Sequence, residues 1–247
     1  MKKTVFYLTL MGSLATASNI ALADSNCATL PNHAALKAAL SAAQNVGNGG
    51  FGLHMWGTIV DRDGIVCAVA FTGGDRGTQW PGSRVISAQK ANTANSFSLP
   101  GLALSTANLY TAVQPGGSLF GLQESNPVDT EVAYKGPSAK YGQSNDPLVG
   151  KKIGGVNVFG GGLALYDASG KIVGAVGVSW DSSCADHNIA WRTRTTLGLD
   201  NVPGGVGPNG TDGIDYSQSS GWAHPLCAVG GEDEVAVSIG AGGPAVP

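Results

Sequence analysis

Two short motifs in the C-terminal third of the chain combine cysteine and histidine in mirrored order. Cys184 precedes His187 by three positions, and His224 precedes Cys227 by three. Thiolate sulfur and imidazole nitrogen are the ligands of closed four-coordinate zinc sites, so one interpretation is a metal centre. The other is a Cys184–Cys227 disulfide that brings His187 and His224 together, where two imidazoles can ligate haem iron or another metal.

The first 23 residues predict export. Lys2 and Lys3 precede a mostly apolar stretch, Val5–Leu22, and Ala21–Ala23 has the small-x-small pattern of a signal-peptidase site. We therefore expect a signal peptide over 1–23, a periplasmic or secreted protein, and no membrane anchor.

Export bears on the four cysteines, which also include Cys27 and Cys67. An even number of cysteines in an oxidising compartment favours disulfides over metal ligation. Four cysteines allow three pairings, among which the sequence alone does not choose. Of these we favour Cys27–Cys67 with Cys184–Cys227.

Further candidate ligand-binding residues are cationic or aromatic. Lys90 lies on an otherwise mostly apolar helical stripe, where its ammonium either meets an anionic group such as a propionate or extends to water. Arg84 lies at the start of the same predicted helix, and Trp222, next to His224, offers a flat apolar surface or serves to bury the tail. The candidate ligand-binding residues are therefore Arg84, Lys90, His187, Trp222 and His224, of which His187 and His224 are also candidate metal ligands.

Several classes of function are excluded. The chain contains no Gly-x-Ser-x-Gly elbow, His-Glu-x-x-His motif or Walker loop. Its 17 acidic residues outnumber its 14 lysines and arginines, and no basic cluster exists to neutralise phosphates. We therefore expect neither a nucleic acid nor an anionic membrane surface as partner.

The elements that position these residues follow from periodicity and turn signals. Apolar spacing predicts helices over 32–44 and 84–97, and a third over 185–197. Paired β-rich segments at 53–60 and 65–71 flank an Asp-Gly turn, and a second pair at 162–167 and 171–180 flanks Ser-Gly. Two hairpins with helices between them predict a mixed α+β domain.

The remaining segments are rich in glycine and proline. We expect mostly loop over 98–155, and we expect an irregular tail over 201–247 that Cys227 attaches to a domain spanning 24–200. A loop as long as 98–155 is more often functional than idle.

Three segments resemble a known family. They are Ser87–Ala94 with Phe97, Gly160–Leu165, and Gly170–Ser179, with Asp186 in the last helix. Together they are similar to the GlcG/HbpS-like family, which includes haem-binding proteins and the C-terminal domain of PduO-type proteins, over roughly residues 33–198. The chain departs from the family pattern at Ala164, where a proline is usual, and at Trp180, where a glycine is usual. The long 98–155 loop, the cysteines and the tail are additional departures.

The resemblance implies a profilin-like fold, with a five-stranded antiparallel sheet between helices in three α/β/α layers. It also implies a homo-oligomer that binds haem or a related tetrapyrrole. Our first hypothesis is accordingly an exported binding protein for such a ligand. Haem is the first candidate cofactor, and zinc or iron is the second. The alternatives are a small-molecule enzyme whose active site is formed by 98–155, and a structural or interaction module.

Overall fold

A four-stranded antiparallel sheet is the centre of the computed structural model, which describes residues 26–243. Strands β1 (Trp56–Asp61) and β2 (Val66–Phe71) form one hairpin, and β3 (Gly162–Tyr166) and β4 (Ile172–Ser179) form the other. Strand β1 pairs with β4, which joins the hairpins in the order β2-β1-β4-β3. The predicted α+β class with an antiparallel sheet is confirmed. The predicted signal peptide, 1–23, lies outside the described residues.

The same local device closes both hairpins. A carboxylate oxygen of Asp61 accepts hydrogen bonds from the backbone N–H groups two and four residues on, both at 2.9 Å. Asp167 does the same in the second hairpin, at 2.9 and 3.1 Å. In each turn the fourth residue is a glycine with a positive φ angle, Gly64 at 75° and Gly170 at 75°. The turn chemistry read from the sequence therefore fixes where each strand ends.

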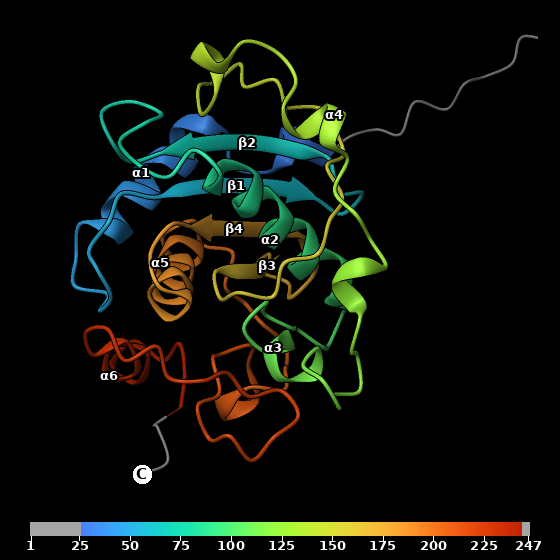
Figure 1. Ribbon diagram of the computed structural model, residues 1–247, viewed down its shortest axis with the longest axis vertical. Helices are drawn as coiled ribbons and strands as arrows, with labels where there is room; N and C mark the ends of the chain where they lie inside the picture. The colour runs from blue at the N-terminus through green and yellow to red at the C-terminus, as the bar shows by residue number, and fades with distance from the viewer. Residues whose placement is uncertain (1–25, 244–247) are drawn as a thin grey trace, which may run out of the picture.

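Helices cover both faces of the sheet (Figure 1). Helix α2 (Ser83–Phe97) lies on one face, and α1 (His33–Gln44) and α5 (Ser183–Thr196) lie on the other. Close approach of α2 to β4 requires Gly177, because a Cβ there would clash with the carbonyl oxygen of Ser87. The alanines of α2 complete this thin interface, and the layers are α/β/α as the resemblance implies.

The prediction of five strands is wrong, since the sheet within residues 26–243 has four. Residues 151–155 run beside the edge strand β2, where the N–H of Val66 donates to the carbonyl of Lys151 at 2.8 Å. A single isolated bridge forms there, between Ile65 and Lys152. Gly154 and Gly155 have φ angles of 66° and 81°, outside the extended region, so the segment cannot continue as a strand.

The 98–155 segment contains only short helices. One buried ion pair anchors it, because the Asp146 carboxylate accepts from Nε of Arg84 at 2.8 Å and also from Nη2. No helix among the described residues combines the length and apolar character needed to cross a membrane. The short helices of this segment and of the two ends are η1 (Asn26–Thr29), α3 (Leu109–Ala112), η2 (Leu122–Glu124), α4 (Thr130–Ala133), η3 (Ser138–Lys140), η4 (Pro208–Gly210) and α6 (Glu232–Ser238).

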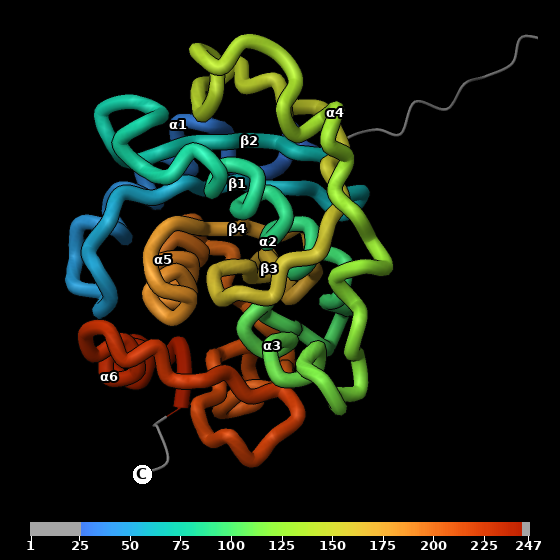
Figure 2. Tube along the Cα trace, viewed as in Figure 1, coloured from blue at the N-terminus to red at the C-terminus, as the bar shows by residue number. Residues whose placement is uncertain are grey.

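The C-terminal tail packs against α5 and α3. Asp212 binds the guanidinium of Arg194 on α5 through two hydrogen bonds, at 2.6 and 2.9 Å, and both side chains are buried. Thr111 in α3 donates its backbone N–H to the carbonyl of Ala223 at 3.2 Å. Figure 2 shows the red trace of the tail beside the green segment around α3. The tail therefore forms part of the folded unit despite its glycine and proline content.

Two disulfides join the cysteines in the pairing favoured from the sequence, Cys27–Cys67 and Cys184–Cys227. No cysteine is left free. The first bond attaches η1 to β2, and the second attaches the tail to the first turn of α5. Both thiolates of the mirrored Cys/His motif are consumed in this bond, so that motif has no thiolate to offer to zinc.

Replacing both Cys184 and Cys227 by serine is expected to lower the free energy of unfolding by about 2–5 kcal/mol, because it opens a large covalent loop. Urea unfolding measures this loss. The matched control is the Cys27→Ser/Cys67→Ser double variant, whose loop is of similar length, with sequence separations of 40 and 43 for the two bonds. Only the first variant should become sensitive to proteolysis within 201–243. Four titratable thiols in the unfolded, unreduced protein would contradict both bonds.

Candidate functional site

An open cavity of about 530 Å³ lies where α2, the end of β4 and the start of α5 meet the loop before β1. Phe51, Trp80 and Phe159 stand at its rim and are half or more exposed, at 66 %, 63 % and 50 %. We call this the aromatic cavity. Its other lining residues are Leu53, Ser83, Ile86, Lys90, Ser179, Trp180, Asp181, Ser183 and Asp186. A concave, largely apolar cavity with a few polar groups is typical of a small-molecule site.

A buried ion pair forms part of the cavity lining. The Nζ of Lys90 lies 2.6 Å from Oδ2 of Asp186 and 3.0 Å from the carbonyl oxygen of Val178. Burial lowers the pKa of Lys90, against the opposing effect of the carboxylate. Burial also raises the pKa of Asp186 to about 6, although Lys90 and two backbone N–H groups favour its ionised form. The charge of the lysine is therefore already neutralised inside the protein.

Two aspartates hold the loops around the cavity. Asp186 accepts the N–H of Asp181 at 2.8 Å and that of Trp180 at 3.3 Å. The carboxylate of Asp181 in turn accepts the N–H groups of Phe51 and Leu53, at 2.8 and 2.9 Å. Trp180 has a φ angle of 138°, which costs a bulky residue conformational energy, and its ring lies against Trp80 with centroids 3.5 Å apart. Asp186 thus fixes the backbone of Trp180 on one side of the cavity, and Asp181 fixes the backbone of Phe51 on the other.

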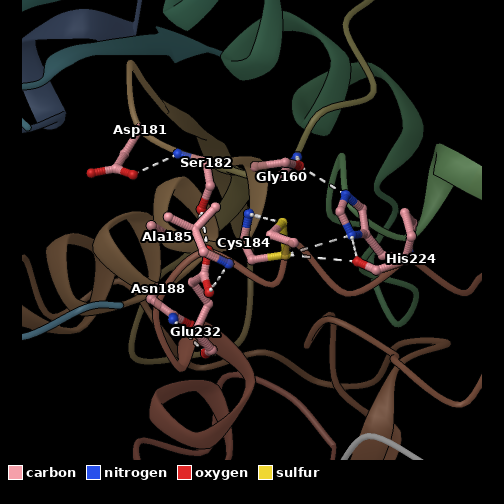
Figure 3. The surroundings of a disulfide bond; sticks show 12 residues. Gly160, Asp181, Ser182, Cys184, Ala185, Asn188, His224 and Glu232 are labelled. Carbon is pink, nitrogen blue, oxygen red and sulfur yellow. Dashed lines mark hydrogen bonds between the residues drawn. A yellow bond between two sulfur atoms is a disulfide. The ribbon is translucent and has the colours of Figure 1, made fainter. Parts of the chain in front are cut away.

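The Cys184–Cys227 disulfide connects the cavity to the tail (Figure 3). His224 lies on one side of this bond, and its Nε2 is 2.8 Å from Oγ of Ser183. Glu232 lies on another side, where its carboxylate accepts the hydroxyl of Ser182 at 2.7 Å. Residues that follow β4 by more than 40 positions therefore contact the first turn of α5, next to the cavity.

Of the candidate residues from the sequence, Lys90 lines the aromatic cavity and Arg84 does not. The guanidinium of Arg84 is fully used inside the protein, by Asp146, by the Ala133 carbonyl at 2.8 Å, and by the ring of Tyr141 at 3.7 Å. Its contacts give Arg84 a structural role at the 98–155 segment.

The two candidate histidines are buried and point to different partners. His187 is fully buried, with Nε2 3.0 Å from the carbonyl of Ala241 and with no partner for Nδ1 among residues 26–243. His224 is 2 % exposed and binds Ser183 and Pro225. Neither lines the aromatic cavity. Trp222 also lies outside it, half-buried against the cluster around Leu109.

Sequence analysis missed the three rim aromatics. Phe51, Trp80 and Phe159 belong to three loops far apart in the chain and show no periodicity. One local signal was present, because each lies within two residues of a glycine: Gly50 and Gly52, Gly82, and Gly160. A large aromatic in a glycine-rich loop has little core around it, which favours exposure for binding.

The 98–155 loop contributes nothing to the aromatic cavity. Three of its residues, Tyr134, Ser138 and Tyr141, line a second cavity of about 530 Å³ together with Trp56 and Arg76. An active site formed by this loop, as the alternative hypothesis predicts, would therefore lie at the second cavity and not at the aromatic cavity.

The sequence matches a family model described as haem-degrading protein HbpS-like, over residues 30–194. This is about two thirds of the 247 residues. The chain belongs to the HbpS-like family. The match confirms the resemblance found in the sequence, and it ends before Cys227, His224 and the rest of the tail. No curated protein sequence matches this HbpS-like chain.

Three solved structures are similar to this HbpS-like protein at low identity. Klebsiella pneumoniae ORFY has 24 % identity and a TM-score of 0.44, covering 68 % of this chain and 90 % of its own. A PduOC–haem complex has 21 % identity and a TM-score of 0.48, covering 68 % and 94 %. A double mutant of Streptomyces reticuli HbpS has 20 % identity and a TM-score of 0.44, covering 79 % and 99 %.

The buried ion pair leads to a double-variant prediction. Lys90→Met leaves the Asp186 carboxylate buried without its counter-ion and should cost about 3–5 kcal/mol of unfolding free energy. Lys90→Met with Asp186→Asn should recover part of this loss, because the amide carries no charge. Urea unfolding measures both. Lys151→Met, at an exposed position, is the control and should change stability by less than about 0.5 kcal/mol. A fully stable Lys90→Met variant would mean that the pair contributes nothing.

Burial also predicts how the two histidines titrate. It lowers the pKa of His187 and of His224 from 6.5 to about 4. Between pH 6.5 and about pH 4 the unfolded chain binds protons that the folded chain does not. The two histidines therefore lower the free energy of unfolding as the pH falls through this range. Asp186 acts in the opposite sense, because its pKa is raised on folding. The imidazole resonances should therefore be followed directly by NMR, with two midpoints near pH 4 expected. A midpoint above 6 for either residue would contradict its burial.

Proposed function

We propose that this HbpS-like protein is an exported binding protein that holds haem, or a related flat tetrapyrrole, in the aromatic cavity. The observation that carries the proposal is the set of rings on its wall. Trp80 and Trp180 lie in contact, and Phe51 and Phe159 stand at the rim. Flat aromatic side chains pack against the face of a macrocycle and bury large apolar area. The family description, which refers to haem, agrees with this ligand class.

The lining of the cavity suits the apolar macrocycle but offers no usual ligand for the iron. None of its twelve lining residues is a histidine, cysteine, methionine or tyrosine, the usual protein ligands of haem iron. The amine of Lys90 is engaged by Asp186 and Val178. We therefore propose that ring contacts hold the tetrapyrrole and that no lining side chain acts as axial ligand. The roles of His187 and His224 as iron ligands, predicted from the sequence, require a different position of the ligand.

The charges of the lining residues orient the ligand. Asp181 is acidic, and the one lining cation, Lys90, is neutralised by Asp186. Ligand carboxylates would therefore meet a negative surface deep in the cavity. We place the apolar edge of the macrocycle inside and its propionates at the solvent-facing mouth.

Export and assembly form part of the same proposal. The N-terminal sequence has the pattern of a signal peptide, and two disulfides are stable in an oxidising compartment such as the periplasm. We further propose a domain over 24–200 with the tail over 201–247 attached to it, and a homo-oligomer as the family resemblance implies. Size-exclusion chromatography with light scattering measures the subunit count.

Haemin and metal-free protoporphyrin IX should bind with affinities within about tenfold of each other, because ring packing rather than iron ligation supplies the free energy. Absorbance of the Soret band and quenching of tryptophan fluorescence follow the two titrations. Trp80→Ala should weaken both ligands about tenfold, since it removes a stacking surface.

Trp222→Ala is the matched control, because Trp222 lies outside the aromatic cavity. It should leave both affinities unchanged. Haemin binding that is far tighter than porphyrin binding, and that is lost in His187→Ala or His224→Ala, would instead support axial ligation by these histidines. Absence of any Soret change at micromolar protein would overturn the proposal.

A further inference from the structure

Ser183 is the one hydroxyl of the aromatic cavity that hydrogen-bonds to a histidine within the described residues. It is the first residue of α5 and is partly exposed. Its Oγ lies 2.8 Å from Nε2 of His224, which comes from the tail beyond the family match. Two residues far apart in the chain are thus brought together, of which Ser183 lines the cavity. Both lie beside the Cys184–Cys227 disulfide, and Figure 3 shows His224 next to this bond.

The hydrogen bonds define the direction of proton donation. Nδ1 of His224 lies 2.7 Å from the carbonyl oxygen of Pro225, which can only accept, so Nδ1 carries the proton. Nε2 of the neutral ring then holds a lone pair and accepts the hydroxyl proton of Ser183. The backbone N–H of Gly160 donates to the same Oγ at 2.6 Å. Ser183 is therefore placed as a nucleophile and His224 as its base, and the carbonyl of Pro225 orients the base.

We propose that Ser183 is a nucleophile, with His224 as its general base, for hydrolysis of small neutral esters bound in the aromatic cavity. The aromatic and aliphatic walls favour an apolar acyl or aryl group, and the carboxylate of Asp181 disfavours an anionic substrate. This activity goes beyond tetrapyrrole binding and does not depend on it.

The reaction balances with water as the only co-reactant. Oγ of Ser183 attacks the ester carbonyl carbon while its proton passes to Nε2 of His224. The carbon–oxygen bond to the leaving group then breaks, and the leaving alcohol takes that proton. Water attacks the acyl-serine with His224 again accepting a proton, which returns to Oγ as the acid departs. The N-terminus of α5, where Ser183 lies, supplies partial positive charge near the developing oxyanion.

The imidazole is a weak base, because burial lowers the pKa of His224 to about 4. Turnover should therefore be slow, and acylation is the step to detect. The Ser183–His224 bond also attaches the tail to α5, so a purely structural role is the alternative that the experiment must separate from a catalytic one.

The test uses the full-length protein without any tetrapyrrole, a fluorophosphonate probe and p-nitrophenyl butyrate. We expect one covalent adduct, assigned to Ser183 by peptide mass spectrometry, and a burst of p-nitrophenolate. Ser183→Ala should abolish labelling, and both Ser183→Ala and His224→Gln should reduce hydrolysis at least about a hundredfold. Ser125→Ala is the matched control: this exposed serine lies outside the aromatic cavity, where its hydroxyl donates to the carbonyl of Leu122 at 2.7 Å, and the variant should keep both activities.

Labelling identifies the nucleophile in the wild-type protein, so the result stands even if a variant is unstable. Labelling at another residue, no labelling, or unchanged hydrolysis in folded Ser183→Ala would overturn the proposal. Haemin titration of the same preparations is a separate measurement, so failure of esterase activity and failure of tetrapyrrole binding are distinguishable.

Discussion

The buried carboxylate of Asp186 connects the elements on which the site depends. It is 2 % exposed and binds Lys90 from α2 on one side and the backbone of Trp180 and Asp181 on the other. Helices on opposite faces of the sheet are thereby joined past the end of β4. Burial of an ion pair seldom adds much net stability, because desolvation offsets the attraction. The pair instead fixes geometry. Loss of Lys90 would leave the Asp186 carboxylate without its counter-ion, and loss of Asp186 would leave the turn at Trp180 and Asp181 without its hydrogen bonds.

The disulfide between Cys184 and Cys227 extends the family domain with a segment that the family match does not include. It places His224 beside Ser183, and α6 beside the start of α5, where Asn188 donates to the carbonyl of Glu232 at 2.9 Å. A glycine-rich tail has little core of its own, so covalent attachment and the buried Arg194–Asp212 pair supply the order that packing does not. The tail thus contributes chemistry to a cavity that the family domain otherwise builds.

Local rules predicted most of the fold, and they failed where contact is non-local. Both hairpins follow from Asp-Gly and Ser-Gly turns, and the N-cap of α1 is Asn32 as its side chain predicts. Within residues 26–243 no fifth strand forms beside β2, because the glycines at 154 and 155 have positive φ angles, outside the extended region. At the site, only Lys90 was identified, from its position on a helical stripe. The rim aromatics lie in three loops that meet only through tertiary contacts, which no sequence period records: the Phe51 loop donates to Asp181, Trp80 lies against Trp180, and Gly160 next to Phe159 donates to Ser183.

Trp180 shows how strain and binding surface are combined at one residue. Its φ angle of 138° belongs to a region that glycine usually occupies and costs another residue of order 1–3 kcal/mol. The hydrogen bond from its N–H to Asp186 and the contact of its ring with Trp80 offset that cost. A glycine at this position would relieve the strain but would remove half of the paired rings. Because the family resemblance implies a glycine at this position, we expect the tryptophan to change the cavity and not the fold.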